Sequence, residues 1–250
     1  MNGSAKPSPA SGARPALSIV FAYYENPAML AFQWKEIAGY SAELKAVIEI
    51  IVVDDGSPVN PAADVPRPDN LPRTSIFRIR EDMPWNQDAA RNIGAHEAQA
   101  RVLLLTDIDH VVPHESVRSI LAREIPHEEF YGLGRIKYFG KHRSEPHPNS
   151  YLLTKKTYWD IGGHDEDFAG IYGKDFLFRK RASRAAREQH LDNIVLARVG
   201  STAVKDAGTR TIPRANTVPK RVWGYLLEWL KKLRLWRGVQ TLQHPYDRVV

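Results

Sequence analysis

Short apolar runs alternate along the chain with stretches in which apolar residues recur at helical spacing. The runs predict β-strands, and two of them, Ile48–Val53 and Val102–Thr106, are apolar enough to be buried on both faces. The other predicted strands are Leu17–Ala22, Ser75–Ile79 and Ile194–Val199. The stretches between them predict helices over Ala28–Gly39, Asp88–Ala100 and Glu115–Glu124. Strand and helix in alternation are typical of an α/β fold with parallel crossovers.

The pattern loosens after Phe130. Tyr131–Phe139 predicts one further strand, and Asp175–Gln189 predicts a helix. Pro219–Arg237 predicts a last helix with two unlike sides, because one stripe along it is apolar and aromatic. That stripe contains Val222, Leu226, Trp229, Leu230, Leu233 and Trp236, and the opposite side carries Arg221, Gly224, Glu228 and Lys231.

Composition and charge change this picture only at the ends of the chain. Residues 1–15 are rich in Ser, Ala, Pro and Gly without periodicity, which predicts a disordered segment before a folded domain at 16–215. The chain has a formal net charge of +6, and residues 216–250, with seven basic and two acidic side chains, hold +5 of it. We therefore expect a basic amphipathic helix and tail at 216–250.

Apolar run length and cysteine count exclude several classes of protein. No apolar run approaches the roughly 20 residues that a bilayer helix needs, and the first residues have no apolar core of a signal peptide. A cytoplasmic location is therefore the default expectation. Because the sequence has no cysteine, it offers no thiol nucleophile, disulfide or cysteine-based zinc site.

Three partners suit the basic helix. Its tryptophan-rich stripe with Lys and Arg flanks is typical of a helix at the surface of an anionic membrane, so residues 219–237 predict a peripheral membrane contact. The same stripe could instead pack onto the folded domain and leave the basic side in solvent. The phosphate backbone of nucleic acid is the third partner. The sequence leaves these three open.

Two polar clusters directly follow the two most apolar strands. Asp54–Ser57 follows the first of them, and Asp107–Asp109 follows the second. Ligands bind at the carboxyl ends of strands in open α/β sheets, although Asp-Gly-Ser is also ordinary turn chemistry. Two carboxylates at Asp107 and Asp109 repel each other unless a cation lies near them. Oxygen ligands alone suit Mn²⁺ or Mg²⁺, so the sequence predicts a divalent cation here.

Five segments, taken in order, resemble the family 2 type of GT-A glycosyltransferases. They are S-I-V-F-A-Y-Y-E from Ser18, I-I-V-V-D-D-G-S from Ile50, A-R-N-I-G-A from Ala90, L-L-T-D-I-D from Leu104, and I-G-G-H-D-E-D-F…G-K-D-F from Ile161. The resemblance implies a GT-A fold, in which helices flank a mixed, mostly parallel sheet, here followed by the C-terminal amphipathic helix. It also implies sugar transfer from a nucleotide-diphosphate sugar, with a UDP-sugar as the first expectation, to a hydroxyl acceptor such as a glycan.

Nucleotide contacts follow from the same resemblance. Ala22 and Tyr23 match the place where the family receives the base, and Asp55 matches the carboxylate that binds the base or its ribose. Arg91 and Asn92 match a helix start near the nucleotide, although a salt bridge and a hydrogen bond on a helix face would also explain them. Ala22 departs from the Pro that is common there, which leaves base recognition open.

Metal and catalytic roles are implied in the same way. Asp107 resembles the ribose or metal-shell carboxylate, and Asp109 resembles the direct ligand of Mn²⁺ or Mg²⁺. Asp175 matches the catalytic carboxylate, which would take the proton of the acceptor hydroxyl and lead to inversion at the anomeric carbon. A carboxylate at a helix start also has a purely electrostatic explanation.

Acceptor and sugar contacts are assigned to five positions. Gly162 and Gly163, followed by His164, would let the backbone approach the sugars closely, and Trp159 could stack on a sugar ring or pack in the core. Lys174 replaces the Glu of the family's Glu-Asp motif and reverses a charge beside the proposed base.

The function that these residues predict is a metal-dependent, inverting glycosyltransferase. Two alternatives remain: a non-catalytic module that binds a nucleotide sugar, and a glycosyltransferase whose acceptor is modified nucleic acid. A nucleotidyltransferase is disfavoured, because it would need a glycine-rich basic loop after the first strand, and Ala22–Pro27 does not provide one.

Overall fold

The protein is described by a computed structural model that covers residues 14–138, 143–144, 146–204 and 212–250. The segment expected to be disordered, 1–15, therefore lies outside the described residues except for its last two. The helices are α1 (Pro27–Ala38), α2 (Ala42–Val47), α3 (Gln87–Glu97), α4 (His114–Leu121), α5 (Lys155–Asp160), α6 (Phe176–Ala185), α7 (Ile212–Ala215) and α8 (Val218–Lys232), with short 3₁₀ turns at Ala62–Asp64 and Glu166–Phe168. The strands are β1 (Leu17–Tyr23), β2 (Ile48–Asp54), β3 (Arg73–Ile79), β4 (Val102–Asp107), β5 (His110–Val111), β6 (Glu129–Lys137), β7 (Arg143–Ser144), β8 (Tyr151–Thr154), β9 (Arg187–Arg198) and β10 (Tyr246–Arg248).

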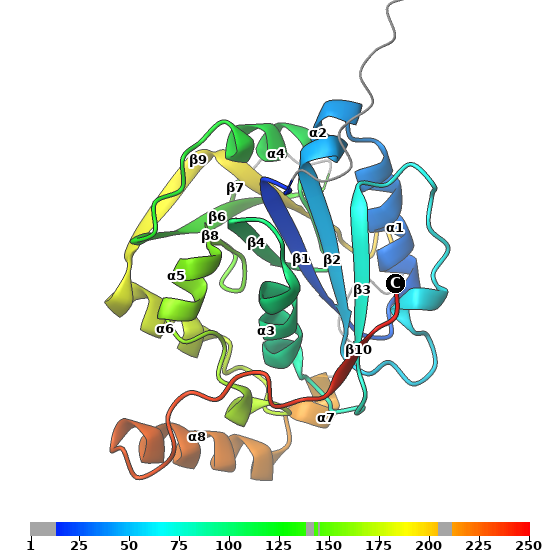
Figure 1. Ribbon diagram of the computed structural model, residues 1–250. Helices are drawn as coiled ribbons and strands as arrows, with labels where there is room; N and C mark the ends of the chain where they lie inside the picture. Colours follow the sequence, from blue (N-terminus) through cyan, green and yellow to red (C-terminus); the bar gives the residue numbers. More distant parts are fainter. Residues whose placement is uncertain (1–13, 139–142, 145, 205–211) are drawn as a thin grey trace, which may run out of the picture.

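All ten strands of the described chain belong to one mixed sheet (Figure 1). Its order is β10-β3-β2-β1-β4-β8-β6-β9-β5, with β7 paired to β6. The first four strands along the chain pair in parallel, whereas β8 and β10 run antiparallel to β4 and β3. The expected α/β fold, with helices flanking a largely parallel central sheet, is confirmed.

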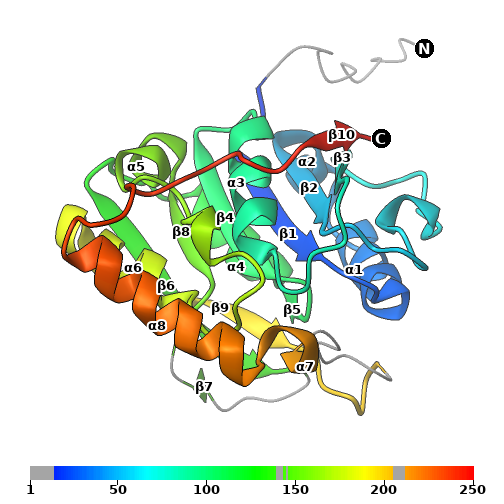
Figure 2. The same ribbon diagram turned by 90° about the horizontal axis from the view of Figure 1, so that it is seen from below.

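Helices cover both faces of this sheet (Figure 2). On one face, α1 and α4 pack on the side of β1 that carries Ile19 and Phe21. On the other face, α3, α5 and α6 pack on the side that carries Val20. A Cβ on Gly94 would lie 2.2 Å from Val20 Cγ1, so the glycine allows α3 to approach β1 closely. This approach fixes the position of the α3 N-terminus at the carboxyl edge of the sheet.

The structure differs from the sequence prediction in the C-terminal half. The helix predicted over Asp175–Gln189 is α6, but it ends at Ala185, and Arg187 already begins β9. β9 pairs in parallel with β6 along its length, and this long-range pairing outweighs the local helical spacing of residues 187–189. The short elements α2, α5, α7, β5, β7, β8 and β10 have no counterpart among the predicted elements.

The predicted C-terminal helix is α8, which ends at Lys232 rather than Arg237 and lies alongside α6 (Figures 1 and 2). Its buried side is narrow: Leu227 packs with Phe168, Ile171 and Leu177. The chain then returns to the sheet, where β10 pairs with β3. The residues after 216 therefore complete the edge of the sheet. No helix in the described part of the chain has both the length and the apolar character to cross a membrane.

The apolar stripe of α8 does not pack onto the domain. Val222, Leu226, Trp229 and Leu233 are all exposed, whereas Gly224 on the opposite side is buried. The interpretation in which the stripe covers the domain and the other side faces solvent is therefore wrong. The reason is steric and electrostatic, because the side with glycine and charged residues fits against α6 and the acidic turn at 165–167.

Candidate functional site

A small cleft opens where β1, β2 and β4 end. Its volume is about 110 Å³. Residues lining it come from three strand ends and from the segment that enters α3: Ala22, Tyr23, Tyr24, Asn26, Asp55, Trp85, Gln87, Asp107, Ile108 and Asp109. Five of the residues that the sequence assigned to donor or metal binding therefore meet in one place, as expected of strand ends at one edge of a sheet.

The two consecutive aspartates after β2 have different roles. Asp54 accepts hydrogen bonds from the backbone N–H groups of Ser57 (2.9 Å) and Ala62 (2.8 Å), which is turn chemistry. Asp55 Oδ2 accepts one from Asn86 N (2.8 Å), but its buried Oδ1 has no partner among the described residues. Burial raises the pKa of Asp55 well above its ordinary value. Since buried acceptors are rarely left unpaired, Oδ1 is available for a donor on a ligand.

Arg91 of α3 binds Asp107 from the interior of the protein. The guanidinium is buried and donates through Nη2 to Asp107 Oδ1, while its Nε and Nη1 have no hydrogen-bond partner among the described residues. Burial raises the pKa of Asp107, and the charge of Arg91 limits the rise. The ring of His147 lies 3.5 Å from the second oxygen, and burial lowers the pKa of His147 to about 2, so that this ring is neutral.

Asp109 is the more acidic of the two carboxylates. His110 Nδ1 lies 2.7 Å from its Oδ1, and Arg198 Nε lies 3.7 Å from its Oδ2. Burial opposes the ionisation of Asp109, but the hydrogen bond and charge of His110 outweigh this effect and lower its pKa. Asp109 therefore lines the cleft as an ionised carboxylate.

The donor set of the cleft fits a hard divalent cation. Among the described residues, no group of three or more His, Cys, Asp or Glu side chains is placed to hold a metal ion by itself. Two carboxylates that line one cleft are nevertheless enough for Mn²⁺ or Mg²⁺, which keep several waters and take further ligands from substrate phosphates. The site thus fits a cation that binds together with a diphosphate.

Asp175 is linked to the cleft by two residues that line it. Gln87 Nε2 donates to Asp175 Oδ1 at 2.6 Å, and Trp85 Nε1 lies 3.4 Å from the same oxygen. Asn149 Nδ2 donates to Oδ2 at 3.3 Å. Burial raises the pKa of Asp175, and the charge of Arg91 limits the rise. A raised pKa brings a carboxylate closer to the range in which it accepts a proton from an alcohol.

Trp85 and Gln87 are functional candidates that the sequence analysis missed. Trp85 has a φ of 62°, a left-handed conformation that is rare and strained for a large side chain, and such strain clusters at functional sites. Its ring contacts Tyr172 edge-on at 4.7 Å. Trp85 precedes the helix that contains A-R-N, and Gln87 is its first residue. The sequence could have indicated them only as polar and aromatic residues at the start of that helix.

Asn92 and His164 do not line the cleft. Asn92 is fully buried, and its amide bonds to Glu166 (2.6 Å), Tyr158 (2.5 Å) and the backbone of His164 (2.8 and 2.9 Å). The His164 ring stacks on Phe178 at 4.2 Å in the interior. These bonds give Asn92 and His164 a structural explanation: they tie α3 to the segment before α6.

The glycine pair lies in the same buried region. A Cβ on Gly163 would lie 2.8 Å from Asn92 Oδ1, and the nearest side chain to Gly162 is that of Val239. Both glycines have positive φ, 65° and 93°, so they are needed for the turn of the chain. The close approach that they allow is to α3 and the C-terminal segment, not to the cleft.

Trp159 and Lys174 also lie away from the cleft. Trp159 is half-buried on α5, where it packs edge-on against Tyr158 at 5.0 Å. Lys174 is buried, and its Nζ donates to Glu228 of α8 at 3.0 Å and lies 4.1 Å from the centre of the Tyr225 ring. The charge that precedes Asp175 is thus neutralised by α8.

The sequence and the fold were compared with known proteins. Residues 18–185 match the sequence model of the family described as Glycosyl transferase family 2. No curated protein matches the sequence significantly. The fold is similar to S. aureus TarS 1-349 in complex with UDP-GlcNAc, with a TM-score of 0.66 and 13% identity over 86% of this chain and 66% of that one.

Two further solved structures are similar. One is S. aureus TarS 1-349, with a TM-score of 0.59 and 14% identity over 72% of this chain and 59% of that one. The other is the mannosyltransferase PcManGT from Pyrobaculum calidifontis in complex with GDP-Man and Mn²⁺, with a TM-score of 0.56 and 14% identity over 93% of this chain and 69% of that one. The chain thus spans less than two thirds of either TarS chain. At these identities the similarity concerns the fold.

Proposed function

Because the chain belongs to glycosyl transferase family 2, we propose that it moves a sugar from a nucleotide-diphosphate sugar to a hydroxyl acceptor, with a divalent cation and with inversion. One observation carries this proposal: the cleft holds Asp107 and Asp109, and two of its lining residues hold Asp175 at its rim. We put a UDP-sugar first as donor, since one similar structure holds UDP-GlcNAc, and a GDP-sugar second.

The nucleoside would be recognised at the ends of β1 and β2. Asp55 lines the cleft, and its buried Oδ1, which has no partner in the part of the chain that the structure describes, can accept a hydrogen bond from the base or ribose. Ala22, with its small side chain, and Tyr23 line the same wall. An acceptor that already lies in a desolvated wall discriminates strongly against ligands that lack the matching donor.

The diphosphate would lie against the acidic edge. Asp109, with Asp107 beside it, would hold the Mn²⁺ or Mg²⁺, whose charge neutralises the negative charge that develops on the leaving diphosphate. Arg91 keeps Asp107 in position from inside the protein. Preorganised charge of this kind needs no rearrangement at the moment of reaction.

Asp175 would act as the general base. The acceptor hydroxyl forms the new bond to the anomeric carbon, the bond from that carbon to the diphosphate oxygen breaks, and the hydroxyl proton moves to the Asp175 carboxylate. Attack from the face opposite the diphosphate inverts the anomeric configuration. Gln87, Trp85 and Asn149 fix the carboxylate orientation through the hydrogen bonds described above.

The test is a transfer assay with a panel of nucleotide sugars and acceptors, with and without Mn²⁺. We expect Asp109→Ala to lower turnover about 10³-fold, as loss of a metal ligand at a developing charge does. Asp175→Asn should lower it about 10²- to 10⁴-fold, the range of general-base catalysis, while nucleotide binding measured by calorimetry stays intact. Asp69→Asn is the matched control, because Asp69 is exposed and does not line the cleft.

Four results would contradict the proposal. Turnover that survives chelation of the metal would remove the cation from it. Wild-type rates in both cleft variants would remove the assigned residues. Tight binding of the nucleotide sugar without turnover on any acceptor would favour the non-catalytic module, and a product with retained anomeric configuration, seen by NMR, would exclude the role of Asp175.

A further inference from the structure

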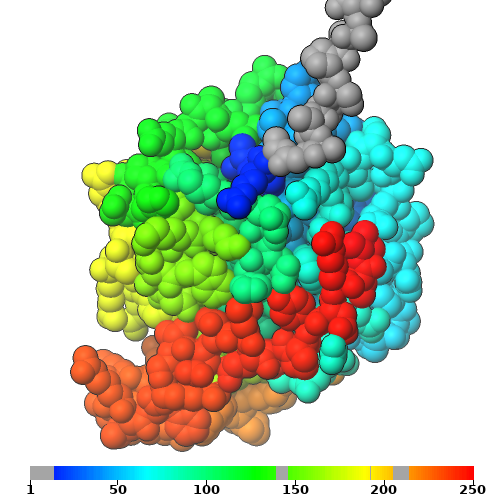
Figure 3. All heavy atoms as spheres, in the orientation of Figure 1, coloured from blue at the N-terminus to red at the C-terminus, as the bar shows by residue number. Residues whose placement is uncertain are grey.

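The outward side of α8 is an exposed apolar face. Tyr225 is 68% exposed, Val222 61%, Trp229 54% and Leu233 47%. Val218 and Leu226 belong to the same face, since all six recur at spacings of three or four along the helix. Figure 3 shows α8, in orange, as a projection at the lower edge of the molecule. Apolar surface that is contiguous and exposed in this way is typical of an interaction site.

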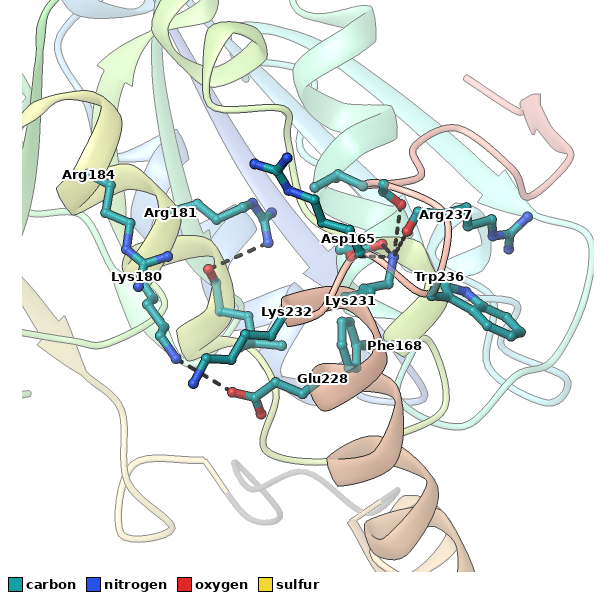
Figure 4. Close-up of a pocket in the computed structure, with 14 residues that line it drawn as sticks. Asp165, Phe168, Lys180, Arg181, Arg184, Glu228, Lys231, Lys232, Trp236 and Arg237 are labelled. Atoms are coloured by element: carbon teal, nitrogen blue, oxygen red, sulfur yellow. Dashed lines mark hydrogen bonds and ion pairs between the residues drawn. The ribbon is translucent and has the colours of Figure 1, made fainter.

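Beside this face lies a second pocket, between α6 and α8. Its volume is about 630 Å³, more than the acidic cleft, and its lining is mainly basic (Figure 4). The basic side chains come from α6 on one side and from α8 and the segment after it on the other: Lys180, Arg181, Arg184, Lys231, Lys232, Arg234 and Arg237. Asp165 and Glu228 are the acidic residues of the lining.

Part of this positive charge is already neutralised. Lys231 lies 2.9 Å from Asp165 and 2.8 Å from Asp167, and Arg237 also binds Asp167. Lys180 pairs with Glu228 at 3.5 Å. These ion pairs hold α8 to the domain and account for the acidic side chains around the pocket.

Three basic side chains of the pocket take no part in these ion pairs. Arg184, Lys232 and Arg234 are exposed and have no ion-pair partner among the residues that the structure describes. They lie around the same pocket, next to the apolar face of α8. Like charges held together repel one another, so an anionic ligand would stabilise this arrangement.

We propose that the basic pocket and the apolar face of α8 together bind an anionic membrane surface, with lipid phosphate groups at the pocket and the tryptophan and leucine side chains in the interfacial region. A helix with a basic flank and a Trp- and Leu-rich face is suited to the plane of that interface. This inference goes beyond the proposed function, and its test needs no turnover.

Two other occupants fit less well. Nucleic acid would use the cations, but it has no need of exposed Val222, Leu226 and Leu233, because it is bound through phosphates and stacked bases. A second copy of this chain would cover the apolar face, but it would bring the same unpaired positive charges towards each other. The combination of aliphatic and basic side chains therefore favours a lipid surface.

The binding surface is close to the rim of the cleft. Lys174, which bonds to Glu228 of α8, directly precedes Asp175. A molecule docked through α8 would therefore keep the Asp175 side of the cleft near the membrane surface.

The experiment is vesicle co-sedimentation of the full chain. Vesicles contain phosphatidylcholine alone, or phosphatidylcholine and phosphatidylglycerol in equal parts. Wild type should bind the second kind and not the first. The double variant K232Q/R234Q should bind about 30-fold more weakly, since each basic residue near an anionic surface contributes about one factor of five. The control K35Q/R67Q removes two exposed charges elsewhere and should bind like wild type.

The apolar face is tested by Trp229→Ala, which should also weaken binding to the anionic vesicles. All these positions are exposed, and thermal melting checks that each variant is folded. Equal binding to both vesicles, binding to neither, or equal losses in K232Q/R234Q and K35Q/R67Q would overturn the proposal. So would full competition by soluble glycerol 3-phosphate, which would assign the pocket to a free phosphate ester, or binding of single-stranded RNA in place of vesicles.

Discussion

The acidic cleft and the basic pocket differ in how their charged side chains are held. In the cleft, Asp55, Asp107 and Asp109 each have a fixed partner, a backbone N–H, the buried Arg91 or the neighbouring His110. In the pocket, Arg184 and Lys232 extend into solvent without an ion-pair partner among the described residues. The charged side chains of the cleft are thus fixed before any ligand binds, whereas those of the pocket are free to change conformation.

This difference follows from the backbone that carries each region. The cleft stands on strand ends of a sheet covered on both faces, so its side chains are oriented by the core. The pocket stands on α8, whose packing rests mainly on Leu227 and on ion pairs. Fixed charges suit a reaction in which atoms must be placed within fractions of an ångström, whereas a diffuse anionic surface requires no single geometry.

The largest effect is expected when the buried guanidinium of Arg91, which lies beneath the cleft, is removed. Arg91→Met leaves Asp107 without its partner, and losing one member of a buried ion pair costs about 3–5 kcal/mol. Because the Asp107 side chain is itself 27% exposed, water offsets part of this loss. We therefore expect the free energy of unfolding to fall by about 3 kcal/mol. Chemical denaturation measures this change.

The control for this variant is Lys156→Met. Lys156 pairs with Asp160 at 2.5 Å, but the two side chains are 62% and 56% exposed. Exposed pairs contribute little, so its denaturation midpoint should hardly move. If both variants were equally stable, the cleft would not be prearranged by buried charge, and the contrast with the basic pocket would be lost.

A smaller effect should appear in the pH dependence of transfer. The base must be ionised to act, so activity is lost as the pH falls through the raised pKa of Asp175. Gln87→Leu removes a hydrogen bond that lowers this pKa, and it therefore moves the acid limb of kcat/KM to higher pH. On that limb we expect about a three- to tenfold lower kcat/KM, the contribution of one such bond.

The change should vanish on the alkaline side, where Asp175 is ionised in both proteins. Gln99→Leu is the matched control, because the Gln99 amide bonds only to the Glu97 carbonyl among the described residues, far from the cleft. A uniform loss at every pH in Gln87→Leu would mean that Gln87 acts by contact with substrate and does not set the state of Asp175.

The sequence was informative where local pattern and long-range structure agree. β1, β2 and β4 are apolar throughout, so their position in the centre of the sheet and the meeting of Asp55, Asp107 and Asp109 at its edge could be predicted. The start of β9 could not, because residues 187–189 continue the helical spacing of α6 and become a strand only by pairing with β6, whereas its end was predicted as the strand Ile194–Val199.

The rest of the site depends on contacts between distant parts of the chain. Asp175 meets Gln87 across 88 positions and Asn149 across 26, and no local pattern encodes such bonds. The A-R-N and G-G-H motifs were expected at the cleft, but Asn92 and His164 bond to each other in the interior. A motif marks residues that belong together without telling whether they touch the ligand or support the residues that do.

The smallest expected effect concerns the support of the basic pocket, through Gly224→Ala on the buried side of α8. Alanine is favoured over glycine within a helix by about 1 kcal/mol, but an overpacked contact costs about 1–3 kcal/mol. Here the added Cβ would lie 2.9 Å from Ile171 Cγ2 and 3.0 Å from Lys174 Cε, and the Lys174 end is held by Glu228. The cost of the close contact should therefore exceed the gain in helix propensity by about 1 kcal/mol or less, and α8 should show slightly faster hydrogen exchange.

The control is Leu226→Ala, which is exposed on the same helix and should leave hydrogen exchange nearly unchanged. Slower exchange in Gly224→Ala would show that α8 is packed loosely enough to absorb a methyl group. In that case the adaptability of the basic pocket would belong to its backbone and not only to its side chains.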